Sequence, residues 1–305
     1  MIYDSITELI GHTPLLRLHR LADAEGLSVP PLAKLESFNP AGSIKDRVGL
    51  GMIDDAERRG LLQPGSVIIE PTSGNTGVGL ALVSVVRGYR LILTMPDTMS
   101  RERQALLRAY GADIVLTPGN EGMAGAVAKA EELHRTLPGS FIPSQFENPA
   151  NPSSHVTTAN ELWTDTDGKI DVLVAGIGTG GTLCGTARRL RELNPALYVV
   201  GVEPASSPLL TKGVAGAHRL QGIGANFVPA NYDPSLVDTV IAVSDDDAIA
   251  TARHLASAEG VLTGFSGGAA LYAAMQVIRE RRCVCPAVIV PDGSDRYLST
   301  GIYDQ

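Results

Sequence analysis

The chain has 305 residues, of which 44 % are apolar and 19 % are charged, so its composition excludes a disordered or fibrous protein. Its length suggests two domains, or one large domain with a smaller companion. The 25 basic and 33 acidic residues give a net charge of −8 with no block of like charge, which argues against nucleic acid or an anionic membrane as the main partner.

Cysteines and apolar runs indicate the compartment. Three cysteines, two of them in a Cys-Val-Cys triplet, are too few for a disulfide framework or a closed metal site, so we expect reduced thiols. The N-terminal segment is acidic rather than basic, unlike a secretory signal. The longest apolar run, residues 78–86, is too short to span a bilayer. The sequence therefore predicts a cytoplasmic protein.

The N-terminal part gives one clear helix. The first forty residues look irregular, with an early turn at 11–14, and we expect them to pack on the later half of the chain. Ser43 and Asp46 then match a capping box, apolar residues recur every four positions, and Gly60 follows the last turn. This spacing predicts a helix with Lys45 in its first turn.

From about residue 66, short runs rich in Val and Ile alternate with helical segments, which is the pattern of βα units on a mostly parallel sheet. The fold class is therefore α/β. The expected strands are 66–70, 90–95, 113–117, 171–175, 198–203, 239–243 and 287–290. The segment 78–86 is apolar on nearly every side, which predicts a buried helix. Ser244 with Asp247, followed by Gly260, predicts another capped helix.

The Pro- and Asn-rich stretch 143–154 interrupts the alternation of strands and helices and predicts a crossing between domains.

Three glycine-rich loops each follow a strand and precede a helix. The first, residues 71–77, carries hydroxyls at Thr72, Ser73 and Thr76 and an amide at Asn75. Backbone N–H groups and the helix dipole at such a place favour an anion. The alternative is a tight turn with capping side chains, although these donors are more than a turn needs.

The second loop spells G-x-G-x-x-G at Gly176, Gly178 and Gly181, and Glu203 follows 22 residues later. This spacing is compatible with a dinucleotide site. Thr179 and Thr182, however, add hydroxyls that suit a terminal phosphate monoester. A phosphate monoester, a dinucleotide and a structural turn all remain open for this loop.

The third loop, residues 264–268, matches the G-x-S-x-G elbow of α/β-hydrolases with Ser266 at its centre. That fold needs a histidine after the serine, yet all six histidines precede Ser266. The hydrolase interpretation therefore fails. Ser266 is then either a helix cap or a hydroxyl aimed at a bound molecule.

Lys45 is the only one of the five lysines that the sequence places in a special setting. In the first turn of a helix the positive end of the dipole disfavours an ammonium and is expected to lower its pKa. A neutral amine is what a Schiff base requires. Together with a phosphate-type loop, this amine suggests pyridoxal phosphate (PLP).

Six motifs in order resemble the cysteine synthase (O-acetylserine sulfhydrylase) family of PLP enzymes, which have fold type II, like the tryptophan synthase β chain. The resemblance runs from about Ser5 to Tyr303. Its motifs are 39–47, 72–77, 145–152, 178–182, 222–224 and Ser266.

The resemblance implies a role for each matching residue. Lys45 would form the internal aldimine with PLP and take the α-proton of the substrate. Asn75 would bind the 3′-oxygen of the cofactor, and Ser266 would meet its pyridine nitrogen. The phosphate would be cradled by Gly178, Thr179, Gly180 and Thr182. The substrate would be held by Thr72, Ser73, Thr76, Gln145 and Gly222.

The implied reaction is β-replacement on O-acetyl-L-serine by sulfide, which gives L-cysteine and acetate through an α-aminoacrylate. A neutral hydroxyl at the pyridine nitrogen makes the ring a milder electron sink and favours loss of the β-leaving group. The family pattern also implies a small mobile domain, 42–141, that carries the carboxylate loop and closes over the substrate. Residues 1–41 and 142–305 would form a large domain that binds the PLP phosphate. A homodimer is a further expectation.

Departures from the family pattern leave the second substrate open. Asn226 stands where many relatives carry glycine, in the loop that lines the entrance for the nucleophile, and His218 and Arg219 lie just before it. Ala41 and Gly267 also differ from common family choices. The close alternatives are an O-acetylserine-dependent cystathionine β-synthase, which uses homocysteine, and an O-phosphoserine-using sulfhydrylase. Other classes are an NAD-dependent dehydrogenase and an idle protein that grips the C-terminal tail of a serine acetyltransferase.

Overall fold

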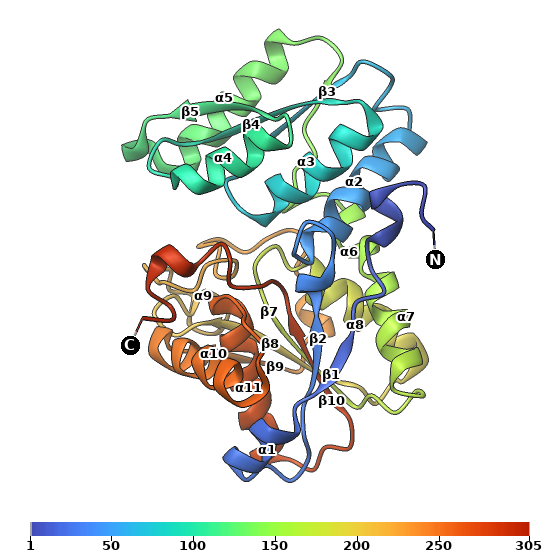
Figure 1. The fold of residues 1–305 in the computed structure, drawn as a ribbon, viewed down its shortest axis with the longest axis vertical. Helices are drawn as coiled ribbons and strands as arrows, with labels where there is room; N and C mark the ends of the chain where they lie inside the picture. The colour runs from blue at the N-terminus through green and yellow to red at the C-terminus, as the bar shows by residue number, and fades with distance from the viewer. Residues whose placement is uncertain (1, 305) are drawn as a thin grey trace. The chain divides into compact units, whose positions relative to one another are not determined.

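The computed structural model describes residues 2–304, which divide into two compact units (Figure 1). Unit 1 comprises Asn39–Ala150 with the N-terminal residues up to Ile10, and unit 2 comprises Gly11–Phe38 with the residues from Asn151 onward. The division after Ala150 falls inside the Pro- and Asn-rich stretch. Within residues 2–304, no helix is long and apolar enough to cross a membrane.

Unit 1 is built on a parallel four-stranded sheet in the order β5-β4-β3-β6. Its strands are β3 (Val67–Pro71), β4 (Arg90–Pro96), β5 (Asp113–Thr117) and β6 (Ser140–Phe141). The three longer strands confirm the predictions to within one residue at either end. The prediction missed β6 because two residues are too few for a periodic pattern.

Helices cover both faces of this sheet (Figure 1). They are α2 (Lys45–Arg58), α3 (Asn75–Arg87), α4 (Arg101–Ala109) and α5 (Gly122–Thr136). Ile68, Leu91 and Leu93 pack with residues of α2, α3 and α4, whereas Ile69 and Ile92 pack with α5. Successive strand residues therefore point to opposite apolar layers, as expected for a sheet buried on both sides.

Two helix predictions need correction in detail. The helix predicted to be buried over 78–86 is buried only up to Ser84, and Val85 and Val86 in the last turn of α3 are 56 % and 40 % exposed. The predicted capping box of α2 does not form either. Ser43 accepts the Lys45 N–H at 3.2 Å, but Asp46 accepts the N–H of Ala41 at 2.6 Å, which fixes the chain before the helix.

Unit 2 is built on a six-stranded sheet in the order β1-β2-β10-β7-β8-β9, parallel except for β1. The strands are β1 (Leu15–Arg17), β2 (Leu32–Leu35), β7 (Val172–Gly176), β8 (Tyr198–Pro204), β9 (Thr239–Val243) and β10 (Pro286–Val290). The later four strands confirm the predictions, and the α/β fold class is confirmed with them.

The expectation that the first forty residues are irregular is wrong. They contain β1, β2 and the helix α1 (His19–Glu25), and β2 is buried between β1 and β10. The sequence hides β2 because its four residues include Lys34, which breaks the apolar run. The expected packing on the later half is confirmed for Gly11–Phe38, which belong to unit 2, but not for the residues up to Ile10, which belong to unit 1.

The helices of unit 2 also form two layers. In Figure 1, α7 (Val156–Asp165) and α8 (Gly181–Leu193) lie on the opposite side of the sheet from α10 (Asp245–Glu259) and α11 (Phe265–Glu280). The α10 capping box is confirmed, since Ser244 accepts the Asp247 N–H at 3.1 Å, and Gly260 ends this helix at φ 71°. The shorter elements are η1 (Ile6–Leu9), η2 (Glu36–Phe38), η3 (Gly119–Glu121), α6 (Ala150–Ser154), α9 (Leu209–Lys212), η4 (Pro234–Leu236) and η5 (Leu298–Thr300).

Candidate active site

In unit 1 the first glycine-rich loop joins β3 to α3, and its predicted residues lie at the start of that helix. Asn75 is the first residue of α3, and Ser73 is half-buried before it. Thr72 and Thr76 are buried, and the Thr72 hydroxyl accepts the Gly74 N–H at 3.3 Å. Backbone N–H groups at the N-terminus of an α-helix point along its axis together with the positive end of the dipole, so this turn can receive an anion.

Gln145 reaches the same turn from a distant part of unit 1. The Thr76 hydroxyl donates a hydrogen bond to Gln145 Oε1 at 2.5 Å, and both side chains are buried. The structure therefore brings together two residues, 69 positions apart, that the sequence resemblance assigns to the same substrate carboxylate.

Glu70 is a residue of this region that the sequence analysis missed. Its buried carboxylate accepts the N–H of Ser144 at 3.0 Å and the N–H of Gln145 at 3.2 Å. Burial raises the pKa of Glu70 to about 7, although the two hydrogen bonds oppose the rise. The only signal in the sequence is a carboxylate directly before the first glycine-rich loop, residues 71–77, which we call the hydroxyl-rich loop.

Lys45 is the first residue of α2 and is partly buried, so it is not a fully solvated surface lysine. Helices α2 and α3 approach so closely that only glycine fits at their contact. A Cβ on Gly79 would lie 2.4 Å from the Lys45 carbonyl oxygen, and a Cβ on Gly49 would lie 2.7 Å from the Gly79 carbonyl carbon. The backbone of Lys45 is therefore fixed against the helix that opens at the hydroxyl-rich loop.

In unit 2 the second glycine-rich loop joins β7 to α8. Gly180 precedes the helix at φ 80°, in the left-handed region that favours glycine. Thr179 is buried and accepts hydrogen bonds from Asn151 Nδ2 at 2.9 Å and from the Gly181 N–H at 3.4 Å. The Thr182 hydroxyl lies 3.2 Å from His155 Nε2. The hydroxyls are thus oriented by neighbours within unit 2.

The predicted cofactor residues of unit 2 converge. A Cβ on Gly178 would lie 2.3 Å from the Gly222 carbonyl oxygen, and one on Gly222 would lie 3.4 Å from Ser266 Oγ. Gly178, Gly222 and Ser266 are therefore neighbours at the carboxyl ends of the strands. A loop that has glycine at these positions and precedes a helix N-terminus fits the phosphate group of PLP, whose oxygens accept backbone N–H bonds.

Ser266 lies in the first turn of α11, which begins at Phe265, within the third glycine-rich loop of the sequence. The N-cap is Gly264, and no side chain caps the helix, so the cap alternative for Ser266 is wrong. Ser266 is buried beside Gly222 instead. This placement agrees with the alternative that its hydroxyl faces a bound molecule.

The dinucleotide interpretation loses its acidic ligand. Glu203 is buried, and its carboxylate accepts the N–H of Leu210 at 2.8 Å, the N–H of Thr211 at 3.2 Å and the Thr211 hydroxyl. A carboxylate occupied in this way is not presented to a ribose. Glu203 instead fixes the segment that follows β8.

The turn that the resemblance places at the entrance for the nucleophile has left-handed residues at Gly222, Gly224 and Asn226. Asn226 Oδ1 accepts the Ser207 hydroxyl at 2.7 Å, and His218 Nε2 lies 2.9 Å from the Gly224 carbonyl oxygen. Asparagine is the side chain that best tolerates the left-handed region after glycine, which explains how it replaces glycine here. The residues that depart from the family pattern thus support the turn itself.

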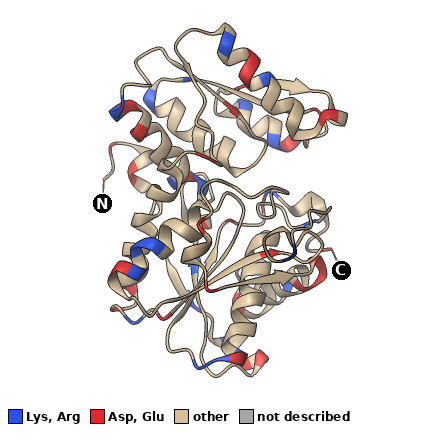
Figure 2. Cartoon of the chain, turned by 180° about the vertical axis from the view of Figure 1, so that it is seen from behind, with Lys and Arg blue, Asp and Glu red and all other residues tan. Residues whose placement is uncertain are grey.

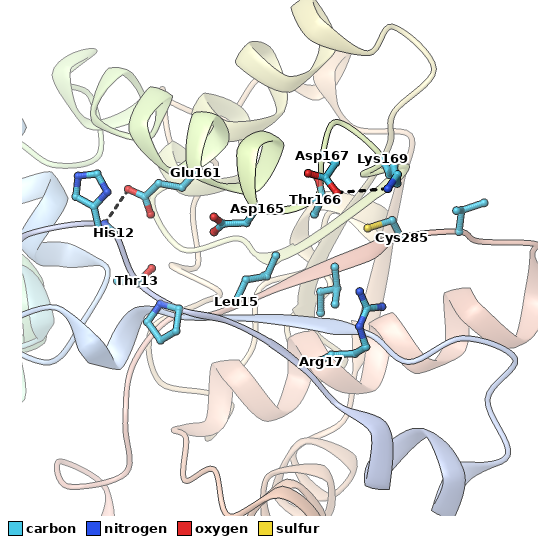
Figure 3. Close-up of a pocket in the computed structure, with 13 residues that line it drawn as sticks. His12, Thr13, Leu15, Arg17, Glu161, Asp165, Thr166, Asp167, Lys169 and Cys285 are labelled. Carbon is cyan, nitrogen blue, oxygen red and sulfur yellow. Dashed lines mark hydrogen bonds and ion pairs between the residues drawn. The ribbon is translucent and has the colours of Figure 1, made fainter.

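A separate hollow of about 600 Å³ runs along the edge strand β1 of unit 2 (Figure 3). Several of its residues precede β7 and β10, at the edge of the sheet opposite to the second glycine-rich loop. Three of its lining residues contact Lys34, which is fully buried: its amine lies 2.9 Å from Glu161, 2.6 Å from the Thr13 carbonyl oxygen and 3.5 Å from Asp165. Lys34 is therefore a buried structural lysine, which its sequence neighbours did not indicate.

Charge and thiol chemistry add no further site. Figure 2 shows basic and acidic residues interspersed over both units. All three cysteines are free, and burial raises the pKa of their thiols. Among residues 2–304, no group of three or more His, Cys, Asp or Glu side chains is placed to hold a metal.

Comparison with known proteins identifies the family of the chain. The pyridoxal-phosphate dependent enzyme family matches residues 6–289. A cysteine synthase of Staphylococcus aureus is 48 % identical over 98 % of this chain and 97 % of its own length. A cysteine synthase structure from Entamoeba histolytica has a TM-score of 0.97 at 41 % identity, covering 100 % of this chain and 92 % of that one.

A third similar protein is named as a different enzyme. The structure of an O-acetylserine dependent cystathionine β-synthase from Helicobacter pylori has a TM-score of 0.93 at 39 % identity and covers 99 % of each chain. Fold, glycine loops and full-length similarity agree: the chain belongs to the PLP-dependent enzymes of fold type II and, within them, to the cysteine synthase family.

Proposed function

We propose that this protein is a cysteine synthase, which replaces the acetoxy group of O-acetyl-L-serine with sulfide to give L-cysteine and acetate. The observation that carries the proposal is the 48 % identity to a cysteine synthase across 98 % of the chain. The contact between Thr76 and Gln145 supports it, because it joins two groups suited to one carboxylate.

PLP supplies an aldehyde for attachment to an amine and a ring that accepts electrons from the substrate. We assign the attachment to Lys45, whose amine would afterwards take the α-proton. Asn75 would bind the 3′-oxygen of the cofactor, and Ser266 would donate to or accept from the ring nitrogen. The phosphate would be held by Gly178, Thr179, Gly180 and Thr182.

The substrate α-carboxylate is assigned to the hydroxyl-rich loop of unit 1, with Gly222 of unit 2 as a further substrate contact. The helix N-terminus favours the negative charge, and neutral donors there orient it without a competing cation. Its donors would be Thr72, Ser73, Thr76 and Gln145. We also propose that residues 42–141 form the mobile domain, and that residues 1–41 with 142–305 form the domain that binds the phosphate.

The test is the absorption spectrum of the purified protein during turnover. It should be yellow, O-acetylserine should change the spectrum, and sulfide should restore it with release of cysteine and acetate. A protein that binds no PLP, or a spectrum that O-acetylserine leaves unchanged, contradicts the proposal. O-Phosphoserine in place of O-acetylserine decides which leaving group the enzyme accepts.

A second candidate is an O-acetylserine-dependent cystathionine β-synthase. It is favoured by the similarity to the H. pylori structure and by Asn226 in the turn that the family pattern places at the nucleophile entrance. Sulfide and homocysteine should therefore be compared as second substrates at equal concentrations. A higher kcat/KM with homocysteine would replace the first candidate with the second.

We further propose a cytoplasmic homodimer that accepts the C-terminal tail of a serine acetyltransferase. Light scattering should give twice the 32.0 kDa mass of the chain. A peptide with the sequence of that tail should compete with O-acetylserine. Fractionation of the source cells tests the compartment, and a monomeric mass contradicts the assembly.

A further inference from the structure

We propose that Glu70 is a positioning residue for the α-carboxylate subsite: its carboxylate holds the Ser144–Gln145 backbone and thereby places the Gln145 side chain against Thr76. This inference rests on the proposed function, because it assigns Gln145 to substrate binding. It concerns a residue that would not touch the substrate itself.

The argument begins with a closed path of contacts within unit 1. Glu70 stands near the end of β3, one residue before Pro71, and the chain then passes through the hydroxyl-rich loop to Thr76. The Thr76 hydroxyl donates to Gln145 Oε1, and the Gln145 N–H donates back to Glu70 Oε1. Gln145 thus contacts the β3–α3 region through its side chain, at Thr76, and through its backbone, at Glu70.

The second oxygen of Glu70 holds a strained residue. Ser144 has φ 54°, a left-handed conformation that is unfavourable for a non-glycine residue, and its N–H donates to Glu70 Oε2 at 3.0 Å. Such a conformation persists only where the surroundings fix it. The two oxygens of Glu70 contribute to this by holding the N–H groups of Ser144 and Gln145 together, while the Ser144 carbonyl oxygen accepts the N–H groups of Glu147 and Asn148.

An ionised carboxylate satisfies both donors best. Two parallel N–H groups need two acceptor oxygens, whereas protonation turns one carboxylate oxygen into a hydroxyl, which is a weaker acceptor, and an amide replaces that oxygen with a donor that opposes an N–H. The pKa of Glu70, about 7, means that this exchange occurs near neutral pH. Burial is the main cause of that shift, and no charged side chain of residues 2–304 is among its causes.

The decisive variant is Glu70→Gln, which has the same shape and one acceptor fewer. Because a carboxylate subsite binds substrate and transition state alike, KM for O-acetylserine should rise about tenfold at pH 8 while kcat changes less than threefold. The ratio of variant to wild-type KM should also fall toward one as the pH drops from 8 to 6, since wild-type Glu70 becomes protonated there. Glu70→Asp, which keeps the charge, should retain the pH dependence.

Glu203→Gln is the matched control. Glu203 is another buried carboxylate near the end of a strand that accepts two successive backbone N–H groups, but its strand is β8 of unit 2. Its replacement should lower the thermal midpoint and leave KM within twofold. The control therefore separates loss of a buried carboxylate from loss of the Gln145 position.

Failure of the Glu70 inference can be distinguished from failure of the proposed function. If the wild type does not form cysteine, the proposed function is wrong. If it does, and Glu70→Gln keeps the wild-type KM or changes it no more than Glu203→Gln, only the role of Glu70 is wrong. If Glu70→Gln does not fold, the same comparison applies to Glu70→Asp, whose shorter side chain should raise KM, and an unchanged KM overturns the inference.

Discussion

Two lysines illustrate how surroundings give one side chain different chemistry. Lys34 is fully buried, and its amine contacts two carboxylates and a carbonyl oxygen within unit 2. An ammonium that donates in this way has no lone pair to offer to an aldehyde. Lys45 opens α2, where the helix dipole disfavours a positive charge. The proposed Schiff base therefore belongs to Lys45.

Replacing these lysines one at a time should give opposite results. Lys45→Ala should lose the absorbance of covalently bound cofactor and keep the far-UV circular dichroism of the wild type. Lys34→Met should keep the absorbance but unfold more easily by about 3 kcal/mol, because it leaves the largely buried Glu161 carboxylate without its cation. Absorbance and denaturant titration check both. Full turnover by Lys45→Ala would refute the assignment.

Glu70 should also make stability depend on pH. Its pKa is about 7 in the folded chain and ordinarily 4.5, so between these values the folded state holds a proton that the unfolded state has lost. The stability from this proton is fully present below pH 4.5 and is lost as the pH rises through 7, by at most about 3 kcal/mol.

Glu70→Gln, which does not titrate, should therefore gain stability relative to the wild type as the pH rises from 5 to 8. We expect the thermal midpoint of Glu70→Gln minus that of the wild type to increase by about 5 °C between pH 5 and pH 8. Glu280→Gln, a change at an exposed carboxylate, serves as the control. A difference that stays constant across this range would contradict the assignment of the proton to Glu70.

At the scale of elements, the contact between α2 and α3 fixes the backbone of Lys45 relative to the hydroxyl-rich loop. Gly79→Ala places a methyl group 2.4 Å from the Lys45 carbonyl oxygen, which must move. We expect a loss of about 1–3 kcal/mol from overpacking and a shifted cofactor absorbance. The control is Gly125→Ala in α5, where the three atoms nearest the new methyl group all belong to the Glu121 side chain rather than to a neighbouring backbone. Equal spectra for the two variants would show that the contact does not position Lys45.

Elements with a strong periodic pattern could be predicted from the sequence, and weak ones could not. The strands at 113–117 and 239–243 agree residue by residue, because their Val- and Ile-rich runs have clear boundaries. Strand β2 was not predicted, because the charge of its central lysine is balanced by acidic residues of α7, which lie far along the chain. Local sequence does not contain such a compensation.

The same distinction holds within the candidate site. Thr72, Thr76 and Ser266 could be found because they lie in loops with a recognisable order of glycines and hydroxyls. Glu70 could not, because its importance comes from two N–H groups at Ser144 and Gln145, more than seventy positions away. Partners brought together only by folding are invisible to a motif.

At the scale of the whole molecule, cofactor binding should stabilise the fold. A ligand that binds only the folded state at about a thousand times its Kd adds about 4 kcal/mol. Removing PLP should therefore lower the thermal midpoint by several degrees, and adding it back should restore the midpoint. Calorimetry on both forms measures this. Lys45→Ala should show a smaller response, and an equal midpoint for both forms would contradict the expectation.

The order of strands in unit 2 has a consequence for synthesis on the ribosome. Strand β2 is made within the first 35 residues but is flanked by β10, whose residues Pro286–Val290 are among the last to emerge. The first large segment that can complete its sheet is instead Asn39–Ala150. Contacts between distant segments form slowly. Until β10 is made, β2 can pair only with β1, so the nascent chain carries one unpaired edge of β2 through nearly all of translation, which makes that edge a target for a chaperone.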